Sequence, residues 1–133
     1  MKAINAKIPK CIVRGSKMEV CDNSGAKIAY LVSIRGSKTV KGRYPSAGVG
    51  DFVNVSIIKG SEDIRKQLVP AIVVRQTKEY KRPDGTRIKF SDNAVVICKD
   101  DNGNPKGTVF KGPIAKEATE RWSAVSKIAR IIV

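Results

Sequence analysis

The sequence has 133 residues, with 26 lysines and arginines against 12 aspartates and glutamates, and a formal net charge of +14. Hydrophobic residues make up 41% of it, so the positive charge decorates a chain that can bury a core, which excludes a disordered basic tail. No stretch approaches the roughly 20 apolar residues of a membrane-spanning helix, so nucleic acid is the expected polyanionic partner and a membrane is not.

The middle of the chain has the pattern of short β-strands separated by turn residues. Segments rich in Val and Ile, bounded by Gly, Pro, Asn or Asp, predict strands at residues 17–20, 28–34, 52–58, 71–77, 86–90 and 94–98. Polar and apolar residues alternate over 51–57, which places every second side chain on one face. Five or six short strands with tight turns predict a mainly β fold built on a small closed barrel.

The two ends of the chain differ from this middle part. Residues 1–14 mix lysines with isolated apolar residues and lack the continuous apolar segment of a secretory signal. Residues 114–121 are rich in helix formers, and Ser123 is expected to cap a second short helix to about residue 129. We therefore predict one domain with an N-terminal extension (1–15), a barrel with its ribbon (16–110) and a helical tail (111–133).

The most informative group of basic residues lies between Arg75 and Phe90. Its centre, Pro83-Asp84-Gly85, predicts a tight turn, because Pro pre-sets one turn dihedral and Gly accepts a positive φ. The turn would fold the stretch into a β-ribbon whose basic tip contacts RNA phosphates. The alternative is a solvated hairpin tip with charges that protect an edge strand. We expect Tyr80 and Phe90 to pack within the strands, with stacking on bases as the alternative.

A second basic segment runs from Arg35 to Gly50. It carries four basic residues and no acidic one, and its glycines would let the backbone approach a phosphate chain closely. The alternative is an ordinary mobile surface loop. The absence of any counter-charge in the segment favours RNA contact.

Catalysis and cofactor binding are not expected. The chain has no His, which excludes Ser–His and Cys–His nucleophile pairs. Gly48-Val49-Gly50 begins like a dinucleotide-binding motif but lacks the third Gly, and Asp22-Asn23-Ser24-Gly25 is typical of a turn. The three cysteines, Cys11, Cys21 and Cys98, are too few and too scattered for a zinc site or a disulfide framework, and they indicate a reducing cytoplasm.

Two binding functions remain open from the residues alone. One is a barrel of the OB type that binds single-stranded nucleic acid, and the other is a structural protein embedded in folded RNA. Only 5% of the residues are aromatic, which is few for a base-stacking platform and favours the second. An enzyme is a distant third, because the carboxylates of Asp22 and Asp51 have no supporting motif.

A series of motifs occurs in the order found in one protein family. The motifs are Asp22-Asn23-Ser24-Gly25-Ala26-Lys27, Ala47-Gly48-Val49-Gly50-Asp51, Val55-Ser56-Ile57-Ile58-Lys59-Gly60, Arg82-Pro83-Asp84-Gly85-Thr86, Gly112-Pro113-Ile114-Ala115-Lys116-Glu117 and Glu120-Arg121-Trp122. The sequence thus resembles the universal large-subunit ribosomal protein fourteen family, in its archaeal and eukaryotic form, over roughly residues 16 to 133. Residues 1–15 have no clear counterpart in this resemblance, and Ser123 stands where the family is expected to have Pro.

The resemblance implies a five-stranded β-barrel with a protruding ribbon and a C-terminal helical region, bound to large-subunit RNA in the cytoplasmic ribosome. It also implies a position at the subunit interface, with an intersubunit bridge to small-subunit RNA. The implied neighbours are the universal large-subunit protein three and a protein of the 24e type. An anti-association initiation factor is expected on the helical tail, at Lys116, Glu120, Arg121, Trp122 and Ser126.

RNA contacts are expected from basic residues of the two segments above and from basic residues in the matching motifs. The full set is Lys27, Arg35, Lys38, Lys41, Arg43, Lys59, Arg65, Lys66, Arg75, Lys78, Lys81, Arg82, Arg87 and Lys89.

Overall fold

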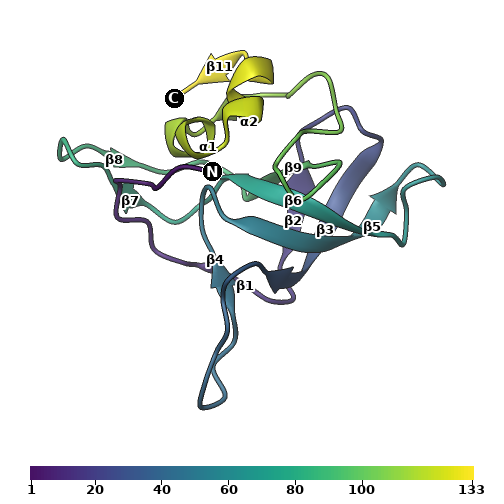
Figure 1. Cartoon of the computed structure of the whole chain (residues 1–133), viewed down its shortest axis with the longest axis horizontal. Helices are drawn as coiled ribbons and strands as arrows, with labels where there is room; N and C mark the ends of the chain where they lie inside the picture. The colour runs from purple at the N-terminus through teal and green to yellow at the C-terminus, as the bar shows by residue number, and fades with distance from the viewer.

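The computed structural model describes residues 1–133, and its centre is a closed barrel of five strands (Figure 1). Neighbouring strands pair antiparallel except for the first and the last, which pair in parallel and close the barrel. In barrel order the strands are β2 (Lys17–Val20), β3 (Ala26–Ile34), β5 (Phe52–Gly60), β6 (Leu68–Arg75) and β9 (Ala94–Ile97). The predicted fold class is confirmed.

Two hydrophobic clusters lie on opposite faces of the barrel wall. Val53, Val55 and Ile57 point into the barrel, whereas Phe52 belongs to the outer cluster, as the alternation along β5 predicts. Strand β9 divides its four residues alternately between the two clusters. Because β9 is buried on both faces, its sequence is a continuous apolar run without alternation.

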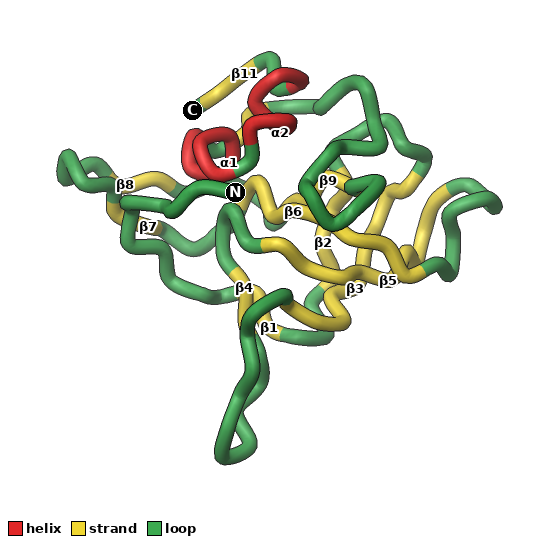
Figure 2. Tube along the Cα trace, viewed as in Figure 1, coloured by secondary structure: helices red, strands yellow, loops and turns green.

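The C-terminal tail covers the outer cluster. It consists of β10 (Pro113–Ile114), α1 (Lys116–Arg121), α2 (Ser123–Ile128) and β11 (Ile131–Ile132), with β10 and β11 paired in parallel. Figure 2 shows both helices together on one side of the strands. Trp122 anchors the tail: it is 4% exposed, its ring centroid lies 5.5 Å from that of Phe52, and its Nε1–H donates to the Gly50 carbonyl at 2.8 Å.

The predicted capping role of Ser123 is wrong. The residue that precedes α2 is Trp122, with an extended backbone, and Ser123 is the first helical residue, without a capping bond from its side chain. The main-chain N–H of Trp122 donates to Ala118 and ends α1, and its carbonyl accepts from Val125 in the first turn of α2. The buried indole fixes the chain at this point, so the turn needs no side-chain cap.

The N-terminal segment, residues 1–15, contacts several other parts of the molecule. The main-chain N–H of Lys2 donates to the Arg121 carbonyl at 3.0 Å, and Lys7 forms an isolated β-bridge with Lys81. Further along, β1 (Ile12–Val13) pairs with β4 (Ser46–Ala47). The segment therefore joins the tail, the ribbon and the segment that follows β3.

Three loops project from the barrel (Figure 1). The first consists of residues 35–45 between β3 and β4, and we call it the finger. The second is the predicted ribbon, a short pair of β7 (Tyr80–Lys81) and β8 (Arg87–Ile88), so the strand predicted at 86–90 is shorter than expected. The third is the turn between β5 and β6, residues 61–67. None of the helices is long and apolar enough to cross a membrane.

Candidate nucleic-acid interface

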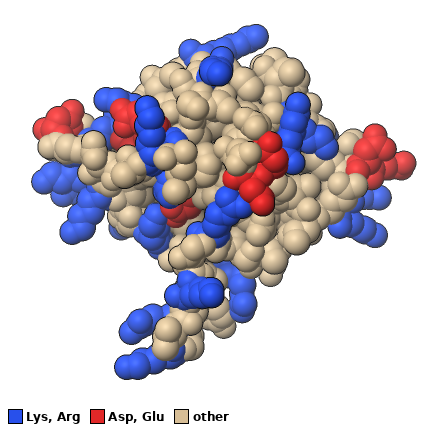
Figure 3. Space-filling view, in the orientation of Figure 1, with Lys and Arg blue, Asp and Glu red and all other residues tan.

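The finger carries the most one-sided charge of the molecule. Lys38, Lys41 and Arg43 are exposed on it and form no ion pair within the protein. Left-handed backbone at Lys41 (φ 63°) and Gly42 (φ 76°) turns the chain at the tip. In Figure 3 this projection bears blue side chains and no red ones. Closely spaced cations without counter-charge are suited to a polyanion.

The ribbon is basic, but its charge is mixed. Lys78, Lys81 and Lys89 are exposed, and so is Arg87, whose Nε lies 3.7 Å from a carboxylate oxygen of Glu79. At the tip, hydrogen bonds from the hydroxyl and main-chain N–H of Thr86 lower the pKa of Asp84. The positive charge of the ribbon is therefore less one-sided than that of the finger.

A third group of cations surrounds the turn between β5 and β6. Lys27 on β3 and Lys59 on β5 are exposed on neighbouring strands, and Arg65 and Lys66 follow in the turn. Glu62 and Asp63 lie in the same turn, so this group is also mixed in sign. Apart from Arg75, which ends strand β6, the predicted RNA-contacting residues thus fall into three separate groups instead of one patch.

Arg75 and Arg82, both in the predicted set, are engaged inside the protein. Arg75 is 7% exposed, pairs with Asp92 at 3.0 Å and donates to the carbonyls of Lys111 and Pro113. The Arg82 guanidinium pairs with Glu117 at 2.8 Å and donates to the main-chain oxygen of Val133. The sequence predicted that both side chains project from the ribbon as unpaired cations. This is wrong, because carboxylates distant in sequence neutralise both guanidinium groups.

Glu117 is the centre of this buried arrangement. Its carboxylate accepts from the Tyr80 hydroxyl at 2.6 Å and from the Arg82 Nε at 2.8 Å. The hydrogen bond to Glu117 raises the pKa of Arg82, and burial together with that carboxylate raises the pKa of Tyr80. Tyr80 is 1% exposed, so it packs within the fold as predicted.

Arg35 has partners within the protein but is still partly exposed. Its guanidinium lies 4.2 Å from the ring centroid of Phe52 and 3.1 Å from a carboxylate oxygen of Asp101, yet about half of its side chain is exposed. It lines a surface pocket of about 480 Å³ together with Lys10, Asp51 and Arg121. The fold thus places Arg35, a predicted RNA-binding residue, at the same pocket as Arg121, a predicted partner-binding residue.

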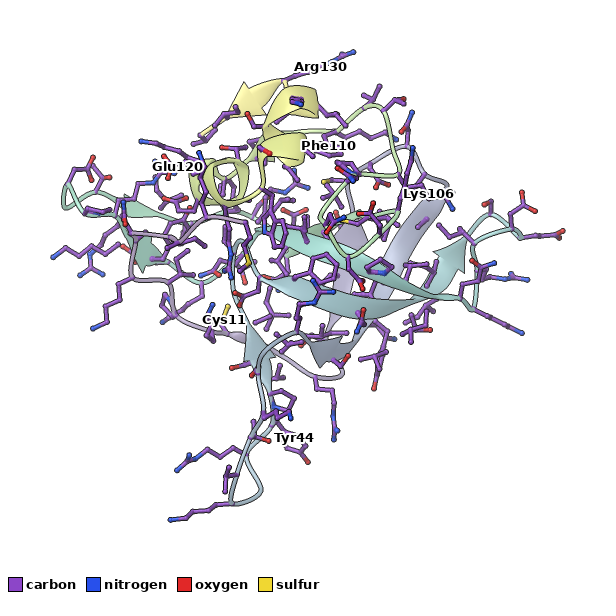
Figure 4. All side chains as sticks on the ribbon, viewed as in Figure 1. Cys11, Tyr44, Lys106, Phe110, Glu120 and Arg130 are labelled. Atoms are coloured by element: carbon purple, nitrogen blue, oxygen red, sulfur yellow. The ribbon has the colours of Figure 1, made fainter.

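The predicted partner surface on the tail is only partly exposed. Lys116 and Glu120 are exposed and lie 3.6 Å apart, and Ser126 is also exposed (Figure 4 labels Glu120 on α1). Arg121 is half-buried and pairs with Asp51, while Trp122 is buried. The assignment of Trp122 to a protein-binding surface is therefore wrong, because its ring is part of the core that holds the tail.

The other candidate motifs have structural roles. Asp22 accepts from the Ser24 main-chain N–H at 3.1 Å, which confirms the predicted turn, and also from the Ile97 N–H at 2.8 Å. Burial raises the pKa of the Cys21 and Cys98 thiols to about 12 in each case, which disfavours the reactive thiolate. Cys11 is exposed, and no cluster of three or more His, Cys, Asp or Glu side chains could hold a metal ion.

The comparisons with known proteins agree with this architecture. A family model described as ribosomal protein L14p/L23e matches residues 11–133. The protein called large ribosomal subunit protein uL14 in Nanoarchaeum equitans is 52% identical over 133 residues, which covers all of both chains. Proteins of the same name in Methanothrix thermoacetophila and Methanococcus vannielii are each 48% identical, over 100% and 99% of both chains.

The chain belongs to this family. It is therefore a protein of the large ribosomal subunit, a structural component of the cytoplasmic ribosome and not an enzyme. The match in Nanoarchaeum equitans includes residues 1–15, so this segment has a counterpart there, contrary to the expectation from sequence motifs.

Two residues near the finger were missed by sequence reasoning. Arg14 lies outside the predicted segments, but its main-chain N–H donates to the Pro45 carbonyl at 3.1 Å, at the base of the finger. Its guanidinium lies 5.5 Å from the ring centroid of Tyr44. No pattern in the sequence relates residues 14 and 44, because their proximity depends on the pairing of β1 with β4.

Proposed function

We propose that this protein binds large-subunit rRNA mainly through phosphate contacts made by the finger, with the ribbon and the turn between β5 and β6 as secondary contacts. The observation that carries the proposal is that Lys38, Lys41 and Arg43 project together without an intramolecular counter-charge. In a ribonucleoprotein such cations neutralise phosphates where RNA helices converge. Arg75 and Arg82 are left out of the proposed surface because carboxylates of the protein already occupy them.

We also propose that the protein lies at the subunit interface and contributes to a bridge with small-subunit rRNA. Family resemblance supports this placement, as it supports the universal large-subunit protein three and a 24e-type protein as neighbours. For the anti-association initiation factor, the exposed residues of the tail, Lys116, Glu120 and Ser126, are the proposed contacts. Trp122 would act indirectly, by holding α1 and α2 in place.

The test of the finger compares two triple variants that lose the same charge. Lys38→Ala/Lys41→Ala/Arg43→Ala removes the finger cations, and Lys99→Ala/Lys106→Ala/Lys111→Ala removes three exposed lysines outside the proposed surface. Binding of each protein to full-length large-subunit rRNA is measured at several KCl concentrations, with excess transfer RNA as competitor. We expect the finger variant to flatten the salt dependence by about two to three units of slope, one per lost phosphate contact, and the control to change it by less than about one.

Equal losses from the two variants would show that net charge alone drives binding and would refute the finger as a specific contact. A parallel measurement uses large subunits from cells that express each variant. The finger variant should leave the subunit at lower KCl in sucrose gradients than the control variant.

A further inference from the structure

Tyr44 is the most unusual aromatic residue of the molecule. It is 68% exposed and makes no side-chain hydrogen bond within the protein, whereas Tyr80 is buried and bonded to Glu117. Pro45 follows it directly and restricts the backbone of Tyr44 to extended conformations. Figure 4 shows Tyr44 on the finger, between its tip and the β1–β4 pair. The ring is therefore held outside the core at a defined place.

One side of this ring is already occupied by a cation. Pairing of β1 with β4 places Arg14 beside the finger, and the Arg14 guanidinium lies 5.5 Å from the Tyr44 ring centroid. A cation over an aromatic ring attracts the negative face of the ring and favours this orientation. With most of the residue exposed, the opposite ring face remains open to a ligand.

The surroundings of Tyr44 define the chemistry of that ligand. The finger places Lys41 and Arg43 close to Tyr44 along the chain and contains no acidic residue. Val40 on the finger is also highly exposed, so apolar and cationic surfaces alternate on it. A π-face combined with backbone-neutralising cations is the arrangement with which proteins hold unpaired nucleotides.

We propose that Tyr44, oriented by Arg14, stacks on an unpaired rRNA base. This inference rests on the proposed function of the finger, and it adds a contact that phosphate neutralisation does not include. A nucleobase fits better than an acidic protein segment, because an acidic segment would pair with the cations and leave the ring face unused. Stacking does not require a particular base, since every base offers a π-face.

The test separates stacking from charge by its salt dependence. Tyr44→Ala, Tyr44→Leu and Tyr44→Phe are compared with the wild-type protein for binding to full-length large-subunit rRNA across the same KCl series. We expect Tyr44→Ala to weaken binding about 5- to 100-fold with an unchanged salt slope, because stacking releases no counterions. The affinity of Tyr44→Phe for the rRNA should stay within about twofold of wild type. Tyr44→Leu should bind clearly more weakly than Tyr44→Phe, because leucine lacks a π-face.

Chemical probing of rRNA in large subunits that contain Tyr44→Ala gives a second readout. We expect one or two unpaired nucleotides to gain reactivity at the sugar in that variant and not in Tyr44→Phe. Unchanged affinity and reactivity for Tyr44→Ala would overturn the stacking inference, and the finger charges could still bind phosphates. Equal binding by Tyr44→Leu and Tyr44→Phe would also overturn it, because the contact would then be merely apolar.

Discussion

The finger and the junction between ribbon and tail are both rich in cations, and they use them in opposite ways. At the junction, formed by Arg75, Tyr80, Arg82 and Glu117, the guanidinium groups are paired with carboxylates and donate to carbonyls of the protein itself. On the finger, Lys38, Lys41 and Arg43 have no such partners, and only Arg35 at its base pairs with a carboxylate, that of Asp101. The number of basic residues in a segment therefore does not tell whether their charge is available to RNA. Acidic residues distant in sequence decide it.

The energetic consequences also differ between the two regions. A buried ion pair costs desolvation on both sides, so it depends on complete hydrogen bonding and is very sensitive to the loss of one partner. Solvated cations on the finger contribute little to folding, and their mutual repulsion is screened by salt. Mutations in the junction should therefore alter stability, and mutations in the finger should alter RNA binding.

The largest effect is expected from Glu117→Ala. Removal of this carboxylate leaves the Tyr80 hydroxyl and the largely buried Arg82 guanidinium without their common partner, at an expected cost of about 3 kcal/mol in the free energy of unfolding. Urea denaturation followed by the fluorescence of Trp122 measures the change. Glu120→Ala is the matched control, since Glu120 is exposed, and it should cost less than about 0.5 kcal/mol.

A loss of less than about 1 kcal/mol in the free energy of unfolding for Glu117→Ala would contradict the proposed difference between the junction and the finger. It would mean that water solvates the Arg82 guanidinium well enough to replace the carboxylate. Arg82 would then return to the set of possible RNA contacts.

An intermediate effect is expected from Trp122→Phe. The variant keeps an aromatic ring against Phe52 but leaves the Gly50 carbonyl without its indole donor, which should cost about 1–3 kcal/mol. Denaturation followed by far-UV circular dichroism measures it. Ser123→Ala is the neighbouring control and should change stability by less than about 0.5 kcal/mol, because Ser123 makes no capping bond. A larger loss for Ser123→Ala would restore the capping role.

The smallest effect on stability is expected from the finger triple variant, Lys38→Ala/Lys41→Ala/Arg43→Ala. These side chains are exposed and unpaired, so the free energy of unfolding should change by less than about 0.5 kcal/mol. Thermal and urea denaturation at low and high salt provide the measurement. A loss above about 1 kcal/mol would show that the finger contributes to folding, and its effect on RNA binding would then need to be separated from unfolding.

The barrel could be predicted from the sequence because its strands follow local rules. The strand predicted at residues 17–20 agrees with β2 in both bounds, and the alternation along β5 separated its two faces. The start of α2 was less predictable. Ser123 follows the usual preference for capping residues, but burial of Trp122 overrides that preference, and burial depends on the whole fold.

The exposed part of the interface could be predicted only in its broad outline. The lack of acidic residues in the finger is visible in the sequence, and it predicts the absence of counter-charge that the structure shows around Lys38, Lys41 and Arg43. The sequence does not reveal that Glu117 reaches Arg82 or that Asp92 reaches Arg75, since each contact depends on tertiary packing. For the same reason the proximity of Arg14 and Tyr44 could not be predicted.

The parallel pairing of β2 with β9 affects how the chain folds during synthesis. Residues 17–20 obtain their second neighbour only when residues 94–97 have left the ribosome, and the hydrogen bond from the Ile97 N–H to Asp22 forms at the same stage. Contacts between such distant segments form slowly, because a long loop must be ordered first. Until then β2 has an unpaired edge that can pair with another chain. We therefore expect nascent chains to be most prone to aggregation just before β9 emerges.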